Sequence, residues 1–165
     1  MHVFIIAALS ADGFIGRDSH HLASWTSKED KQFFVEKTSR AGVVVMGSRT
    51  YETIGKPLKG RLNIVYSRTR SYEGVETTQK EPSLLLKELE QRGYHEVAIL
   101  GGSHIYTLFL GAGVVDTLFL TLEPLLFGAG ISLFSKPLET PLRLKNLARL
   151  GEHGVALEYA LRDLH

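Results

Sequence analysis

Short apolar runs alternate with longer amphipathic stretches over the first three quarters of the chain. The runs are four to eight residues long and are bounded by glycine or charged residues, which is typical of buried strands. The predicted strands are Val3–Ile6, Val43–Met46, Leu62–Tyr66, Val97–Leu100 and Val114–Thr121. Helical spacing predicts helices at Lys28–Thr38 (with Phe33, Phe34 and Val35 near one face), Ser48–Ile54, Pro82–Arg92 and Ser103–Leu110. This alternation predicts a mainly parallel sheet that helices cover on both faces.

The C-terminal part has a different pattern. Residues 142–150 and 155–161 are separated by Gly151-Glu152-His153-Gly154 and predict a β-hairpin. Its apolar positions are Leu142, Leu144 and Leu147 in the first arm and Val155, Leu157, Tyr159 and Leu161 in the second. We therefore expect a single α/β domain over residues 1–165, with a mainly parallel central sheet and an antiparallel C-terminal hairpin.

Composition narrows the classes of protein that fit. The chain has 165 residues and no cysteine, which excludes disulfides, thiolate catalysis and cysteine-ligated metals. The formal net charge is only +1, which argues against a nucleic-acid partner. No apolar run reaches the roughly 18 residues of a membrane span, and the apolar opening is too short for a signal peptide. We expect a soluble, cytoplasmic monomer that binds neither membrane nor nucleic acid.

Glycine stands between a predicted strand and a predicted helix at two places. Gly101-Gly102-Ser103 follows Val97–Leu100, and Gly47-Ser48-Arg49 follows Val43–Met46. Such a turn lets a ligand approach the backbone, and the N-terminus of a helix attracts phosphate. A tight turn in the first case, and an N-capped surface helix in the second, explain the same residues equally well.

Asp30 is the most informative acid. It lies four residues before Phe34, so both side chains point to one side of the predicted helix, where a carboxylate needs a partner or a function. Two capping arrangements are open. Ser27 with Asp30 forms a capping box, whereas Thr26 with Glu29 leaves the Asp30 side chain free.

Three other features favour structural explanations. Arg68, Arg70 and Lys80 follow a strand and fit a solvated edge better than a phosphate site. Gly111-Ala112-Gly113 follows a helix and predicts a helix stop rather than a nucleotide fingerprint. His20-His21 falls in a polar loop, and no histidine spacing indicates a metal site.

Six segments carry motifs whose order and spacing matter more than any one of them. They are Ile6-Ala7-Ala8, Asp12–Gly16, the pair Trp25 and Asp30, Val45–Val65, Leu100–Tyr106 and Leu120-Thr121. Together they resemble the dihydrofolate reductase family over about the first three quarters of the chain. The resemblance implies hydride transfer from NADPH to C6 of dihydrofolate, with protonation at N5. It also implies that the loop around residues 13–25 closes over the site.

The resemblance implies roles for individual residues. Asp30 would hold the pterin, with Thr121 bonded behind it and Trp25 beside it. The implied substrate residues are Ala8, Phe34, Ile54, Leu58 and Arg61, the last paired with the α-carboxylate. The implied cofactor residues are Ala7, Ile15, Gly16, Gly47, Arg49, Thr50, Ser67, Arg68, Leu100, Gly101, Gly102, Ser103, His104, Ile105 and Tyr106. Ser67 and Arg68 would take the 2′-phosphate and so favour NADPH over NADH, and no metal is implied.

The chain departs from the family pattern at several positions. Ser48 stands where the family often has a second basic residue, and Lys31 replaces an apolar residue of the benzoyl contact. Pro124–Phe134, which contains Gly128-Ala129-Gly130, is similar instead to the reductase domain of bacterial riboflavin biosynthesis. That enzyme shares the fold and NADPH but reduces a ribosylaminopyrimidine phosphate. Two alternatives are therefore open: that pyrimidine reduction, or a non-catalytic NADPH-binding module.

Overall fold

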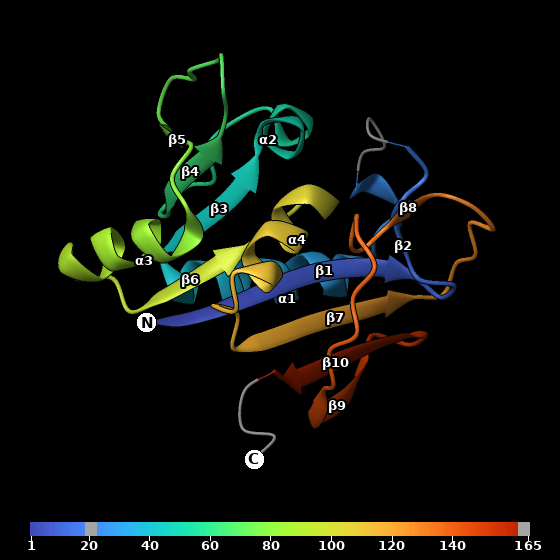
Figure 1. The fold of residues 1–165 in the computed structure, drawn as a ribbon. Coiled ribbons are helices and arrows are strands. Elements are labelled where there is room, and N and C mark those ends of the chain that lie inside the picture. The colour runs from blue at the N-terminus through green and yellow to red at the C-terminus, as the bar shows by residue number, and fades with distance from the viewer. Residues whose placement is uncertain (19–22, 162–165) are drawn as a thin grey trace.

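One eight-stranded sheet organises the structure, a computed structural model in which residues 1–18 and 23–161 are described. The predicted loop histidines, His20 and His21, lie outside these residues. From edge to edge the strands are β5 (Glu76–Thr78), β4 (Leu62–Tyr66), β3 (Val43–Gly47), β6 (Glu96–Ile99), β1 (His2–Ser10), β7 (Thr117–Glu123), β10 (Gly154–Ala160) and β9 (Arg143–Leu150), as Figure 1 shows. Every pair from β5 to β7 is parallel, and β10 and β9 continue the sheet antiparallel. The predicted α/β class with an antiparallel C-terminal hairpin is confirmed.

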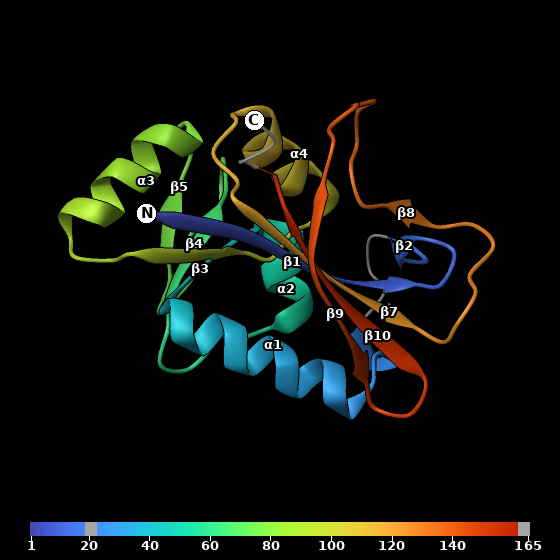
Figure 2. The ribbon, with the colours of Figure 1, turned by 90° about the horizontal axis from the view of Figure 1, so that it is seen from below.

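Helices cover both faces of the sheet, as predicted. Figure 2 shows α1 (Lys28–Ala41) and α2 (Ser48–Ile54) on one side, and α3 (Pro82–Gln91) and α4 (Ser103–Gly111) on the other. Because successive side chains of β1 point to opposite faces of the sheet, this strand contributes to both hydrophobic layers. Phe4 packs on the side of α1, whereas Val3 and Ile5 pack on the side of α3 and α4. None of the helices in the described ranges is long and apolar enough to cross a membrane.

Element boundaries differ from the prediction where the end signal is weak. Helix α1 continues three residues past Thr38, because the glycine that ends it, Gly42, comes only after Ala41 and takes a left-handed φ of 76°. Val35 is half exposed rather than on the apolar face, since successive helical residues point about 100° apart. Strand β7 begins at Thr117 instead of Val114, because an apolar run does not distinguish a buried loop from a strand.

Three strands were not predicted. They are β5 and the pair β2 (Phe14–Gly16) and β8 (Ile131–Ser132), which form a separate two-stranded sheet. Each has three residues or fewer, too short for an alternation to show. A short 3-10 helix spans Ala23–Trp25. The helix stop predicted at Gly111-Ala112-Gly113 is present, with Gly113 at a φ of 69°.

The hairpin pairs as predicted, but its first arm is not buried. Leu144 and Leu147 on β9 are 51% and 62% exposed, because β9 is the edge strand and lies beyond the helices. An irregularity in the register opposite Glu158 and Tyr159 keeps these two leucines on one face, opposite Tyr159 and Leu157. The pattern therefore predicted the strand correctly, and the structure shows that its apolar positions are exposed.

Candidate active site

A cavity of about 1500 Å³ lies at the carboxyl ends of the parallel strands. Residues that end or follow β1, β3, β4 and β6 line it, which is the usual ligand position in a parallel sheet. Thr78 of β5 also lines it, and four strand spacings separate β1 from β5, so the cleft extends about 20 Å along the sheet. This volume exceeds the typical pocket for one small molecule and leaves room for two ligands side by side.

The cavity collects most of the predicted site residues. Those that line it are Ala7, Ala8, Ile15, Gly16, Trp25, Asp30, Phe34, Gly47, Arg49, Thr50, Ile54, Leu58, Ser67, Arg68, Leu100, Gly102, Ser103, His104, Ile105 and Tyr106. Arg61, Gly101 and Thr121 do not line it. Thr121 lies behind Asp30 and forms a hydrogen bond with it, and Gly101 accepts a backbone hydrogen bond from Gly47, which lines the cavity.

The start of α1 places Asp30 in the cavity. Ser27 is the N-cap, and its hydroxyl accepts the Asp30 backbone N–H at 3.0 Å. The cap therefore uses only the backbone of Asp30, and the arrangement with Thr26 as N-cap is wrong. The Asp30 side chain is 8% exposed, and its Oδ1 accepts the Thr121 hydroxyl at 2.5 Å.

The surroundings of Asp30 act on the pKa of its carboxyl in both directions, with a net rise. Burial raises the pKa of the Asp30 carboxyl, and the negative charge of Glu123 raises it further. The hydrogen bond from Thr121, the positive charge of Lys31 and a hydrogen bond from Thr26 oppose this rise and lower the pKa in part. A buried acid with a raised pKa in a large cleft is a strong candidate for a functional group.

Apolar side chains form the wall next to Asp30. Phe34 lies one helical turn further along α1, Ile54 ends α2, and Leu58 follows in the loop. Asn63 fixes this loop, because its side-chain amide exchanges two 2.9 Å hydrogen bonds with the backbone of Leu58. The wall therefore offers a flat, mostly apolar contact surface beside one acid.

Arg61 lies outside the cavity lining. Its Nη1 donates to Thr38 Oγ1 at 2.8 Å, and its Nε donates to the Lys59 carbonyl at 3.0 Å. Partial burial lowers the pKa of the guanidinium. These bonds tie the loop after α2 to the outer end of α1, near the apolar wall.

Glycines let β3 and β6 approach each other at the floor of the cleft. The Gly47 N–H donates to the Gly101 carbonyl at 2.8 Å. A Cβ at Gly47 would lie 3.2 Å from the side chain of Ile105, and one at Gly101, where φ is 110°, would lie 3.0 Å from the ring of Tyr106. The peptide bond between Gly101 and Gly102 is cis. A Cβ at either position would therefore require Ile105 or Tyr106, which shape the floor, to shift by a few tenths of an ångström.

The N-terminus of α4 opens onto the cleft. Gly102 caps the helix without a side-chain hydrogen bond, so the N–H groups of its first turn are available to an anion. Tyr106 anchors this turn: its buried hydroxyl lies 2.7 Å from the Ile6 carbonyl oxygen and 2.8 Å from that of Leu100. Burial, and then the charge of Asp30, raise the pKa of Tyr106, so the phenol stays neutral.

Cations line the other end of the cleft. Arg49 and Arg68 line it and make no ion pair with any residue in the described ranges. Arg70, by contrast, is paired with Glu52, and the hydrogen bonds from the Tyr72 hydroxyl and then from Arg70 lower the pKa of Glu52. Of the cations after β4, Arg68 is thus the one best able to accept a ligand.

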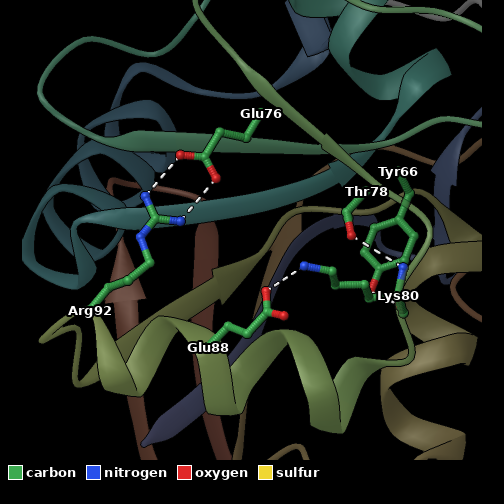
Figure 3. A network of polar contacts seen from close by, with 6 residues as sticks. All are labelled: Tyr66, Glu76, Thr78, Lys80, Glu88 and Arg92. Carbon is green, nitrogen blue, oxygen red and sulfur yellow. Dashed lines mark hydrogen bonds and ion pairs between the residues drawn. The ribbon is translucent and has the colours of Figure 1, made fainter.

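Lys80 is also neutralised within the protein, as Figure 3 shows. Its Nζ donates to Glu88 Oε2 at 2.6 Å, and its backbone N–H donates to Thr78 Oγ1 at 3.1 Å. Its carbonyl accepts the Tyr66 hydroxyl at 2.8 Å. Burial, and then the charge of Glu81, raise the pKa of Tyr66 to about 12. This network shapes the rim of the cleft beside Arg68.

Sequence reasoning missed part of the lining. Ile131, Ser132 and Phe134 line the cleft because β8 pairs with β2, and Thr78 and Gln79 line it because β5 adds to the sheet edge. Local pattern carried no signal for either pairing. The described residues contain no group of three or more acidic, histidine or cysteine side chains that could hold a metal ion.

The loops around residues 12 and 127 are joined at the mouth of the cleft. Asp12 accepts the backbone N–H groups of Phe127 at 3.1 Å and Gly128 at 2.7 Å, and the Ser10 hydroxyl at 2.7 Å. These bonds, led by that from Ser10, lower the pKa of Asp12. The ring of Phe127 packs edge-on against Trp25, with centroids 5.1 Å apart. The predicted loop over the site includes residues 19–22, which are not described.

Comparisons with known proteins identify the family of the chain. The sequence profile of the family described as dihydrofolate reductase matches residues 2–122. The chain is 38% identical over 128 residues to dihydrofolate reductase type 3 of Salmonella typhimurium, covering 73% of this chain and 71% of the relative.

Solved structures agree on the fold. Dihydrofolate reductase from Enterococcus faecalis, complexed with NADP(H) and RAB-propyl, superposes with a TM-score of 0.80 at 24% identity, covering 98% of this chain and 97% of that one. A protein assigned to riboflavin biosynthesis in Shewanella sp. PV-4 gives 0.82 at 22% identity, covering 99% of this chain and 100% of that one. At such identities these two similarities establish the fold alone.

Proposed function

The chain belongs to the dihydrofolate reductase family, and from this premise we propose that it reduces 7,8-dihydrofolate to 5,6,7,8-tetrahydrofolate with NADPH. The observation that carries the proposal is Asp30, a buried acid with a raised pKa at one end of a cleft large enough for two ligands. The 2-amino group and N3 of a pterin present donors to a carboxylate, so Asp30 binds and orients that edge of the ring.

The residues at the other end of the cleft fit NADPH. A diphosphate needs N–H donors and cations, which the uncapped first turn of α4 and Arg49, unpaired within the described residues, supply. Ser67 and Arg68 stand at the end of β4, where a guanidinium suits a 2′-phosphate. When bound, NADPH supplies the hydride that C6 of dihydrofolate accepts.

The protein contributes alignment and protonation. Phe34, Ile54 and Leu58 hold the pterin and benzoyl groups by apolar contact and exclude bulk water from the reacting rings. Asp30 polarises the pterin through its 2-amino and N3 edge. A group that holds this edge does not touch N5, so we propose that the N5 proton arrives through water.

Turnover of dihydrofolate by the purified protein tests the proposal. NADPH oxidation is followed by absorbance for the wild type, for Asp30→Asn and for Asp116→Asn. Asp116 is the matched control, because its carboxylate accepts the Val3 N–H at 2.9 Å at the opposite end of β7, about 20 Å away. We expect Asp30→Asn to lose at least about 100-fold in kcat and Asp116→Asn to keep its activity.

A second candidate is reduction of a ribosylaminopyrimidine phosphate. It is favoured by the segment 124–134, whose Ile131, Ser132 and Phe134 line the cleft. Wild-type protein that binds NADPH and turns over the pyrimidine but not dihydrofolate would reverse the assignment. NADPH binding without turnover of either substrate would indicate a binding module.

That the protein is a cytoplasmic monomer and has no nucleic-acid partner stays a prediction. Light scattering after size exclusion tests the monomer directly. A dimer would point to the exposed leucines of β9, Leu144 and Leu147, as the first surface to mutate.

A further inference from the structure

A second buried acid lies close to Asp30. Glu123 ends β7 and is only 3% exposed, although it lies outside the stretch that the family profile matches. Its Oε1 accepts the Ser27 hydroxyl at 2.9 Å. Acidic side chains are rarely buried to this degree unless a partner or a function holds them there.

Ser27 connects the two acids. As the N-cap of α1 it accepts the Asp30 N–H at 3.0 Å, while its own proton goes to Glu123. Thr121 is two residues before Glu123 on the same strand, so both side chains face α1. Thr121 holds the Asp30 carboxylate, and Glu123 holds the turn that carries Asp30. Two side chains on one face of β7 therefore each form a hydrogen bond with the first turn of α1 or its N-cap.

We propose that Glu123 is a positioning residue of the active site, which fixes the first turn of α1 through Ser27 and places a second carboxylate beside Asp30. Its role in turnover rests on the proposed reductase function. Its effect on the Asp30 carboxyl is a property of the protein alone and is measured without substrate.

The charges around Asp30 have opposite effects. Glu123 on β7 disfavours ionisation of Asp30 by like-charge repulsion, and Lys31 on α1 favours it. Lys31 is held in place, since its Nζ donates to the Thr26 carbonyl at 2.6 Å and to Thr26 Oγ1 at 3.0 Å. Tyr106, the other titratable group that interacts with Asp30, is buried and neutral. Removal of the Glu123 charge must therefore lower the pKa of the Asp30 carboxyl, and removal of the Lys31 charge must raise it.

Carboxyl ¹³C NMR on protein labelled at Asp and Glu measures these shifts. Glu123→Gln keeps an acceptor for Ser27 and removes the charge, so the pKa of Asp30 falls. Lys31→Met removes the positive charge, so the pKa of Asp30 rises. Asp116→Asn, at the far end of β7, leaves it unchanged. Because a structural defect has no preferred sign, opposite shifts in the two variants support an electrostatic role.

Wild-type protein supplies an arm that does not depend on a variant folding. In the wild type, the pKa of the Asp30 carboxyl should lie above the ordinary value for an aspartate. An Asp30 pKa at or below the ordinary value in the wild type overturns the electrostatic role, as does a folded Glu123→Gln protein with an unchanged Asp30 titration.

Kinetics test the positioning role. Ser27→Ala keeps both charges but breaks the link, so kcat/KM for dihydrofolate should fall several-fold, and Ser27→Thr should restore most of it. In Glu123→Gln the pH dependence of turnover should move to lower pH with that of Asp30. An unaffected kcat/KM in Ser27→Ala overturns this role. A further outcome is that the two variants shift the pKa of Asp30 in opposite directions while the wild type turns over no dihydrofolate. That result supports the electrostatic coupling of the two acids and refutes the reductase function instead.

Discussion

Replacement of Thr121 by valine tests the environment of Asp30 most directly. The change exchanges one hydroxyl for a methyl group of similar size on a residue that is 1% exposed. It removes the 2.5 Å hydrogen bond to Asp30 Oδ1. That bond lowers the pKa of Asp30, so its loss raises the pKa further above the ordinary value.

The cost of this change depends on pH. A hydrogen bond to a charged group contributes about 1.5–3 kcal/mol to stability, and one between neutral groups about 0.5–1.5 kcal/mol. The folded variant holds the Asp30 proton to higher pH, whereas the unfolded chain is unaffected. The free energy of unfolding should therefore fall by about 1 kcal/mol while Asp30 is protonated, and by about 2 kcal/mol once the wild-type carboxyl is ionised.

Urea unfolding at a series of pH values from 4.5 to 8 measures how the cost of Thr121→Val in free energy of unfolding changes with pH. With a slope of roughly 2 kcal/mol/M, the midpoint should drop by about 0.5 M at the acid end and about 1 M at the alkaline end. Thr107→Val is the control, because its hydroxyl donates to the Ser103 carbonyl at 2.7 Å and accepts the Ser135 N–H and hydroxyl, so among the described residues its partners do not titrate. Its cost should not change with pH. An equal cost for Thr121→Val at both ends would refute the assignment of Asp30 as a buried, titrating partner of Thr121.

Five further substitutions test the site and the rest of the molecule. Asp30→Asn should stabilise the protein at pH 8 relative to wild type, because the raised pKa makes ionisation of Asp30 destabilising as pH rises; an unfolding midpoint in urea that is lower than that of wild type would contradict this. Arg68→Ala should raise KM for NADPH about tenfold or more and leave KM for NADH nearly unchanged, and equal effects on both would remove Arg68 from the 2′-phosphate site. Gly101→Ala should lower the free energy of unfolding by at least about 1–2 kcal/mol, since its φ is 110° and its Cβ would meet Tyr106; a variant that melts like wild type would show that this floor can move. Phe109→Ala, at 0% exposure, should cost about 3–5 kcal/mol in urea unfolding, whereas Leu147→Ala on β9 should change stability by less than about 0.5 kcal/mol; a large cost at Leu147 would mean that this face is covered in solution.

Much of the fold followed from local pattern. The limits of α2 and β4 matched the structure, because Gly55 at the end of α2 and the charged residue before β4 are strong stop signals. The hairpin turn and the helix stop at Gly113 also followed from local signals. Helix caps, glycine turns and strand alternation each depend on a few adjacent residues, so they can be predicted without the rest of the chain.

The candidate site was only partly accessible to this reasoning. Asp30 was noticeable locally, since a carboxylate shared a helix face with Phe34. Most other site residues were assigned through family motifs, and the structure places the majority of them in one cleft. Their individual roles are proposals that the variants above test.

The sequence by itself determined which segments form strands and helices, and where glycine leaves the backbone accessible. Only the tertiary structure decided what surrounds Asp30: Thr121 and Glu123 reach it from more than 90 residues away in the chain. It also decided that Arg70 is neutralised by Glu52 while Arg68 is not, and that the leucines of β9 lie on an exposed edge. The reason is physical. Secondary structure responds to neighbours in the chain, whereas burial, charge pairing and the pKa of an acid depend on neighbours in space.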